Sequence, residues 1–269
     1  ASGDLGSDGV GGHVGQNWGD MRQSVSQTSG FSITRFQLQA SGSPSATDFG
    51  WFKHNLSSGS DDNPDVIIMK RIDGAGYWYV WHSGMGAWST STSTGVFNQL
   101  FLQTDDKKGS AHHPPRFRKS TTEGPPTNDG KIWVDRSSIY TGDGQDEFIC
   151  YAWKAVSGVS AFGTYEGNSS GYQSNGDGGV SNLNFKPRWV MVKGIDNDSR
   201  QWVIHDAFRV ASDTKTSNLY ANLNNSDDTA STHAIEFHGP TNGGFRFNTN
   251  SSYVSINGND ETYIFMAFA

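Results

Sequence analysis

Three pairs of adjacent carboxylates are the residues of this sequence that are best suited, by type, to acid–base chemistry. They are Asp105/Asp106, Asp146/Glu147 and Asp227/Asp228. A glycosidase needs two carboxylates at a set distance across a cleft, one of them with a raised pKa. All three pairs lie among polar residues in predicted turns, where solvated acids are ordinary, and nothing near them in sequence would tune a pKa. We therefore expect no catalysis at these pairs and interpret the chain as a non-enzyme.

The histidines and the single cysteine do not supply a catalytic set either. His112 and His113 have no further His or Cys nearby, so we expect no zinc site there. His205 and Asp206 are neighbours on a predicted strand and point to opposite faces, so they do not form a ready dyad. Cys150 stands in the apolar run FICYAW, where it is expected to be a small buried hydrophobic residue. One cysteine also excludes an internal disulfide.

Loops rich in oxygen ligands are the only sign of a bound cation. They are DDNPD at 61–65, DNDS at 196–199 and NSDD at 225–228. None has the spacing and terminal Glu of an EF-hand, and Asx-turns account for the same residues without a metal. We expect no cofactor, and Ca²⁺ is the one ion that these loops leave open.

Aromatic side chains, together with one basic loop, are the remaining candidates for a binding surface. Exposed Trp and Tyr stack on sugar rings and anchor interfaces. Trp78 and Trp202 occupy matching positions in two similar stretches of the chain, so we expect both in the core. The residues without such a match are the candidates for surface binding, namely Trp51, Trp88, His112, His113, Arg116 and Arg118.

The two similar stretches define the organisation of the chain. PDVIIMKR at 64–71 matches PRWVMVKG at 187–194, and each is followed by an acidic turn and an aromatic strand. Each stretch closes on a related strand, DEFICYAWKA at 146–155 and ETYIFMAFA at 261–269. Ordered similarity of this kind marks a tandem repeat. Alignment on Trp78 and Trp202 places His82 opposite Asp206, whereas alignment on Lys70 and Lys193 places His82 opposite His205. We prefer the aromatic anchor, because turn lengths vary more readily than strand registers, and then the repeats share no histidine.

Composition favours strands in both repeats. The 269 residues include 33 Gly, aromatics are 13% and charged residues only 17%, which suits short strands joined by tight turns. We predict an all-β protein of two tandem, similar β-sandwich (jelly-roll-like) domains. The predicted parts are a lead-in at 1–29, repeat one at 30–155 with an insertion at 104–130, and repeat two at 158–269. The predicted strands include 30–36, 66–72, 97–103, 131–135, 188–194, 201–205, 218–223, 234–238 and 244–248.

Charge and hydropathy exclude two kinds of partner. The net charge is −7 and the pI is about 5.5, whereas nucleic-acid binding depends on Lys and Arg that neutralise phosphates. No apolar run approaches the roughly 18 residues of a membrane span. We therefore expect no nucleic acid and no membrane insertion.

The order of several short motifs resembles that in tandem-repeat modules of bacteriophage tail-fibre and tail-associated virion proteins. The matching segments are Gly30–Ile33, Pro64–Lys70, Gly158–Ser160, Phe162–Asn168, Pro187–Lys193 and Asn218–Leu223, with Cys150 and both closing strands. The resemblance covers residues 30–269. It departs from the family pattern where Phe36 is followed by QLQASG in place of a Gly-rich GNG, and where the loop at 104–130 is longer.

This resemblance implies a structural protein of the phage particle, located at the tail surface and serving as a fibre or adhesin. Its expected partners are other virion proteins, a host cell-surface glycan and further copies of itself, with a homotrimer as the leading expectation. The open alternatives are a lectin or carbohydrate-active enzyme on the same sandwich, and a surface component of the capsid or neck.

Overall fold

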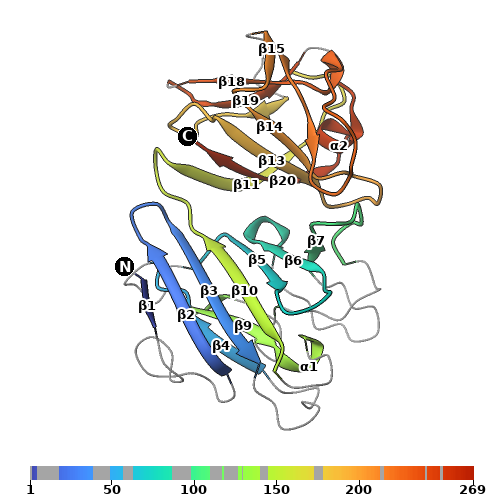
Figure 1. Cartoon of the computed structure of the whole chain (residues 1–269). Coiled ribbons are helices and arrows are strands. Elements are labelled where there is room, and N and C mark those ends of the chain that lie inside the picture. Colours follow the sequence, from blue (N-terminus) through green and yellow to red (C-terminus); the bar gives the residue numbers. More distant parts are fainter. Residues whose placement is uncertain are drawn as a thin grey trace. The chain divides into compact units, whose positions relative to one another are not determined.

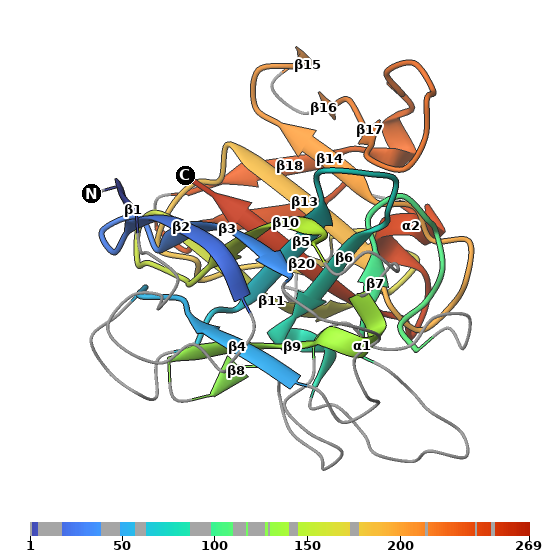
Figure 2. The same ribbon diagram turned by 60° about the horizontal axis from the view of Figure 1, so that its bottom comes forward.

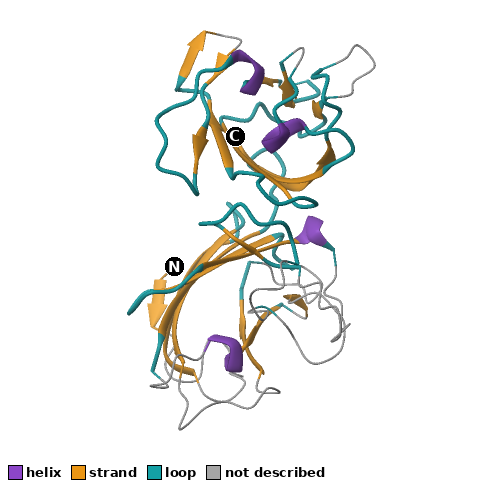
Figure 3. Cartoon of the chain, turned by 90° about the vertical axis from the view of Figure 1, so that its right-hand side faces the viewer, coloured by secondary structure: helices purple, strands orange, loops and turns teal. Residues whose placement is uncertain are grey.

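The computed structural model describes most of the chain. The described residues are 2–4, 18–38, 49–56, 63–86, 98–109, 117, 127–128, 130–139, 145–172, 178–212, 215–239, 241–248 and 251–269. Strands dominate them, as Figure 3 shows, and the described helices are single turns. These are α1 (Arg136–Ile139), α2 (Val254–Asn257), η1 (Ser83–Met85) and η2 (Ser231–His233). The prediction of an all-β fold is confirmed.

The contacts of the chain divide it into two compact units. The first unit comprises Ala1–Phe101 and Lys108–Lys154, and the second comprises Leu102–Lys107 and Ala155–Ala269. The short segment Leu102–Lys107 thus belongs to the second unit, and no sequence pattern predicts this assignment. The two units are described one at a time below.

A large antiparallel sheet and a small one form the first unit. The large sheet has the order β1 (Ser2–Asp4), β2 (Trp18–Ser26), β3 (Phe31–Leu38), β10 (Glu147–Trp153), β5 (Val66–Arg71), β6 (Trp78–His82) and β7 (Leu100–Phe101). The small sheet has the order β4 (Phe49–Lys53), β9 (Lys131–Asp135) and β8 (Thr127–Asn128), as Figure 2 shows. The two sheets pack face to face, since the rings of Phe36 and Phe52 lie 5.2 Å apart.

The second unit repeats this plan. Its larger sheet has the order β11 (Ser160–Glu166), β20 (Thr262–Phe268), β13 (Trp189–Gly194), β14 (Val203–Asp206) and β17 (Leu219–Tyr220). The facing sheet has the order β12 (Gly179–Val180), β19 (Gly244–Phe247) and β18 (Ile235–His238), and a two-stranded ribbon joins β15 (Val210–Ser212) to β16 (Lys215–Thr216). Tyr165 packs on Phe247 across the interior, with ring centroids 5.2 Å apart.

Strand order and register correspond between the units. In the first unit the closing strand β10 lies between β3 and the central strand β5, as Figure 1 shows, and in the second unit β20 lies between β11 and the central strand β13. Val66 pairs with Trp153 and His82, and Trp189 pairs with Phe268 and Asp206. His82 therefore corresponds to Asp206, and the alignment on Trp78 and Trp202 is confirmed.

The structure differs from the sequence analysis at the chain's beginning and at two short strands. Within the predicted lead-in, β2 is a nine-residue strand that pairs along β3, with a bulge between Gly19 and Arg22. Polar residues fill most of β2, so it carries little hydrophobic signal. The segments 97–103 and 218–223 form only the two-residue strands β7 and β17.

The cores follow the strand patterns. β5 is buried on both faces over its first four residues, as its continuous apolar run predicts, and β10 alternates buried and half-buried positions. The core of the second unit is aromatic, with Tyr165, Tyr263 and four Phe residues among its members. Trp202 is also buried, at 2% exposure, whereas Trp78 is only half buried. The expectation that Trp78 is a core residue is wrong, because it lies at the outer end of β6, beside a solvent-exposed turn.

Trp202→Ala should lower the free energy of unfolding of the second unit by about 3–5 kcal/mol, the range typical of large aromatic truncations in a core. Trp78→Ala is the matched control at the corresponding position and should cost clearly less, since Trp78 is half buried. Urea unfolding followed by circular dichroism measures both. Equal losses in the two variants would contradict this account.

Candidate functional site

Only one of the six predicted surface residues lies in the described part of the chain. Trp51 is on β4, at the small sheet of the first unit. The other five, Trp88, His112, His113, Arg116 and Arg118, lie outside the described residues, as does most of the insertion 104–130.

Trp51 belongs to a cation–aromatic cluster. It pairs across the sheet with Trp133 of β9, and the two ring centroids are 6.1 Å apart. The Lys131 ammonium nitrogen lies 4.2 Å from the centre of the Trp51 ring and 6.0 Å from that of Trp133. One face of the Trp51 indole is therefore occupied by a cation, an interaction worth about 0.5–1 kcal/mol at an exposed site. A sugar stacking on this face would first have to displace Lys131.

The first acid pair lies in the second compact unit. Asp105 Oδ2 accepts a hydrogen bond from Gln201 Nε2 at 3.2 Å, and the Asp105 carbonyl oxygen accepts one from Lys193 Nζ at 3.2 Å. The backbone N–H of Lys107 donates to Asp198 Oδ1 at 3.0 Å. These contacts tie the segment Leu102–Lys107 to the turn after β13.

The second pair, Asp146 and Glu147, lies at the start of β10 and forms ion pairs with the neighbouring strands of the first unit. Asp146 is fully buried, and its Oδ1 lies 2.7 Å from Nη2 of Arg71, while Glu147 Oε1 lies 2.6 Å from Nη2 of Arg35. Each carboxylate therefore has a guanidinium partner, which is the arrangement of a structural ion pair.

The third pair contains a carboxylate–imidazole contact that the sequence analysis missed. Asp228 Oδ2 lies 2.6 Å from His233 Nδ1 and accepts a hydrogen bond from the Tyr220 hydroxyl at 2.8 Å. Partial burial by itself would raise the pKa of the Asp228 carboxyl, but bonds from the Ala230 N–H, His233 and Tyr220 lower it overall. Asp228 is thus held ionised, the opposite of what a general acid requires.

The surroundings of His233 favour a structural role for this contact. Its ring stacks on Tyr253 at a centroid distance of 3.8 Å, and the Tyr253 hydroxyl donates to the Tyr220 hydroxyl at 3.1 Å. A hydrolytic dyad needs a nucleophile beside the imidazole. Within the described chain, the side chain that hydrogen-bonds the His233 ring is Asp228.

Buried histidines and the cysteine are also structural. His82 Nδ1 accepts a hydrogen bond from the Gly84 N–H at 2.9 Å and caps the turn η1. His205 is fully buried, and this burial, followed by the charge of Arg209, lowers its pKa to about 3. Burial raises the pKa of the Cys150 thiol far above neutrality, so Cys150 is not a nucleophile at neutral pH.

Charged residues at corresponding positions of the two units hold turns. Lys70 Nζ donates to the Arg71 carbonyl oxygen at 2.9 Å, and Lys193 Nζ donates to the Gly194 carbonyl oxygen at 3.0 Å. Glu261, which corresponds to Asp146, accepts a hydrogen bond from Arg200 Nε at 2.6 Å. The charged residues that the two units have in common therefore stabilise the fold by holding turns and strand ends in place.

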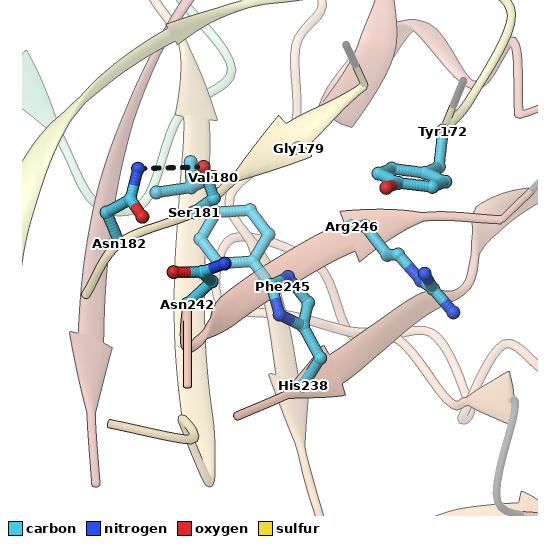
Figure 4. A pocket seen from close by; sticks show the side chains of 9 residues that line it. All are labelled: Tyr172, Gly179, Val180, Ser181, Asn182, His238, Asn242, Phe245 and Arg246. Atoms are coloured by element: carbon cyan, nitrogen blue, oxygen red, sulfur yellow. Dashed lines mark hydrogen bonds between the residues drawn. The ribbon is translucent and has the colours of Figure 1, made fainter. Parts of the chain in front are cut away.

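A pocket of about 360 Å³ lies beside the smaller sheet of the second unit (Figure 4). Its lining residues are Tyr172, Gly179, Val180, Ser181, Asn182, His238, Asn242, Phe245 and Arg246. Strands β12 and β19 run so close together that a Cβ on Gly179 would lie 2.4 Å from the Phe245 carbonyl oxygen. Phe245 is fully buried and also belongs to the core. The pocket is thus built on a rigid part of the unit.

Polar groups of the pocket come from its loops and from the outward face of the sheet. Asn182 and Asn242 have left-handed backbone angles, with φ of 66° and 54°. Arg246 Nε donates to Glu236 Oε2 at 2.7 Å, and its guanidinium carbon lies 4.7 Å from the centre of the Tyr172 ring. Burial, followed by the charge of Arg246, lowers the pKa of His238, so this imidazole is neutral at pH 7. The sequence signals for this site are the turns GDGG at 176–179 and TNGG at 241–244, which read as ordinary turns.

Metal and membrane sites can be assessed for the described residues. Among them, no group of three or more His, Cys, Asp or Glu side chains could hold a metal ion. The helices that the structure describes are too short and too polar to cross a bilayer.

The fold and the pocket define an all-β protein whose two units share a framework and differ in their surfaces. The chain matches the model of a domain of unknown function, DUF7483, over residues 10–269, and it belongs to that family. The match spans both compact units. No curated protein and no solved structure matches the chain.

Lys193→Met should remove a pH dependence of stability. Burial, opposed by Asp105, Asp106 and Asp198, lowers the pKa of Lys193 from 10.5 to about 7. Between these values the unfolded chain binds more protons than the folded one, so stability rises with pH, by at most about 1.4 kcal/mol per unit. The wild type should therefore gain stability relative to Lys193→Met from pH 7 to pH 9 in urea titrations.

Lys70→Met, at the corresponding position of the first unit, is the matched control for the same substitution. Parallel stability curves for the wild type and Lys193→Met over this pH range would contradict the role given to burial.

Proposed function

We propose that this chain is a structural module of a bacteriophage virion, at the tail surface, where it displays or binds a host-surface receptor. The proposal takes its class of protein from the motif order over residues 30–269, which resembles that of tail-fibre and tail-associated modules. The observation that carries it is that the two units share packing and turn-holding residues, while their surface clusters differ.

This distribution is what a display module needs. Chemistry required by both units would be present in both, yet the residues common to them, such as Lys70/Lys193 and Asp146/Glu261, bond backbone carbonyls or guanidinium groups. Each unit then carries its own surface, with Trp51 and Lys131 in the first and the pocket of Figure 4 in the second. A fold that is repeated in both units but carries different surface residues in each is suited to binding a host-surface receptor.

The second candidate function is a lectin or a carbohydrate-active enzyme built on the same sandwich. The pocket favours the lectin, because pockets of this size with a few convergent polar groups are the usual form of small-ligand sites. The enzyme is favoured only by the Asp228–His233 contact, whose carboxylate is held ionised. Of these two, the lectin accords better with the geometry.

Antiserum raised against the purified chain should label intact phage particles in immunogold electron microscopy, with the gold at the tail. Particles of a phage that lacks the gene are the control. Gold on the capsid or neck would support a surface component at those positions instead. Absence of gold from intact particles, with the protein detected free in the same lysate, would overturn the proposal.

Self-association is part of the same proposal, because symmetric assembly turns weak receptor contacts into avidity. Light scattering of the purified chain should give three times the protomer mass of 29.3 kDa. We expect the insertion to make the contact between protomers, so a variant with residues 110–126 replaced by a Gly-Ser linker should have a lower assembly mass, close to that of one protomer. This replacement spares Lys107, which bonds Asp198. A monomeric wild type would contradict the assembly.

A further inference from the structure

We propose that the pocket between β12, β18 and β19 binds a single neutral pyranose unit of a glycan. This inference rests on the proposed function, since it names the ligand class through which a receptor-binding module would act. It follows from the size of the pocket, the type and placement of its polar groups, and its charge.

The size of the pocket fits one sugar ring. Its volume is about 360 Å³, near the lower end of the roughly 300–1,000 Å³ typical of small-ligand sites. Backbone contacts fix its shape, because a Cβ on Gly244 would lie 1.9 Å from the Val180 carbonyl oxygen. The cavity cannot widen at this point without separating the end of β12 from the start of β19.

Two ends of different chemistry face each other across the pocket in Figure 4. Asn182, Asn242 and His238 lie on one side, and Tyr172 and Arg246 lie on the other. A primary amide offers a donor and an acceptor side by side, which is the complement of two adjacent hydroxyl groups. Val180 supplies apolar surface for the C–H face of a sugar, whereas the half-buried Tyr172 ring already carries the Arg246 guanidinium on one face, 4.7 Å from its centre.

The backbone of the two asparagines adds a second argument. Glycine adopts left-handed φ angles without steric cost, and asparagine is one of the few other residues that tolerate them. Asn182 and Asn242 therefore place an exposed amide side chain at positions whose backbone conformation glycine could also adopt. Asn182 Nδ2 makes only a long contact of 3.4 Å to Ser181 Oγ, so its amide remains available to a ligand.

Charge selects a neutral sugar. Of the lining residues, Arg246 and His238 can carry positive charge. Arg246 is paired with Glu236 through Nε and Nη2, both at 2.7 Å, and the imidazole of His238 is neutral at pH 7. A carboxylate, sulfate or phosphate group on the ligand would find no uncompensated cation among the lining residues, and the chain as a whole carries a net charge of −7.

Titration of the full chain with methyl glycosides tests the assignment. The neutral set comprises glucose, galactose, mannose and N-acetylglucosamine, and the acidic set comprises glucuronic acid and sialic acid. Binding is followed by saturation-transfer NMR and by chemical-shift changes in labelled protein. At least one neutral glycoside should bind with a Kd on the order of millimolar, and the acidic set should bind at least about tenfold more weakly.

Asn182→Gly and Asn242→Gly are the diagnostic variants, because glycine keeps the left-handed backbone and removes only the side chain. Each should raise the Kd by at least about tenfold with an unchanged thermal midpoint. Asn184→Gly is the matched control: its φ of 61° is also left-handed, but it does not line this pocket. It should bind as the wild type does.

Three results would overturn the inference. They are no binding by any neutral glycoside, preferential binding of the acidic set, and equal loss of binding in the Asn184→Gly control. These results are separable from the particle experiment. Gold on the tail without glycoside binding would refute the pocket and leave the display function standing. Binding that depends on both asparagines, in a protein absent from particles, would keep the pocket and favour the lectin.

Discussion

The placement of the closing strand is the constraint on which each unit depends. β10 pairs with β3 on one side and β5 on the other, and β20 pairs likewise with β11 and β13. The last strand of each unit in sequence is thus the one that connects an earlier strand, β3 or β11, to the central strand, β5 or β13. Neither larger sheet is complete until the whole unit has been traversed, so its strand pairings have a long sequence separation, the kind of contact that slows folding.

The charged framework residues gather around this strand. Asp146 and Glu261 stand directly before β10 and β20. Each is bound by an arginine, Asp146 by Arg71 at the end of β5 and Glu261 by Arg200 in the turn after β13. These pairs fix where the closing strand begins and therefore its register. A one-residue shift would turn Phe148, Cys150 and Ala152 from the core toward the outer face. Lys193 extends the framework by holding the carbonyl oxygen of Asp105 from a distant part of the chain.

The two units differ in the surfaces that this framework carries. The smaller sheet of the first unit presents paired tryptophans with a lysine over them, whereas the corresponding sheet of the second unit borders a pocket lined by amides, an imidazole and a tyrosine. Both surfaces use strands to support side chains and loops to vary them, so the difference between the units is one of loop length and turn residues.

Local sequence patterns were enough to predict the strand-rich fold, the correspondence of the two halves and the burial of β5, because alternating and continuous apolar runs are local signals. They also predicted that Cys150 and Trp202 lie in the core. The roles of Trp78, β2 and Leu102–Lys107 became visible in the three-dimensional structure alone. Trp78 lies at a solvent-exposed strand end, and β2 is polar yet completes a sheet. Leu102–Lys107 joins the second unit through the carbonyl and carboxylate oxygens of Asp105 and the backbone N–H of Lys107, none of which forms a recognisable sequence motif. The pocket likewise required the fold. Asn182, Asn242 and His238 are ordinary turn and strand-end residues in the sequence, and they form a site only because β12 and β18 flank β19 in space.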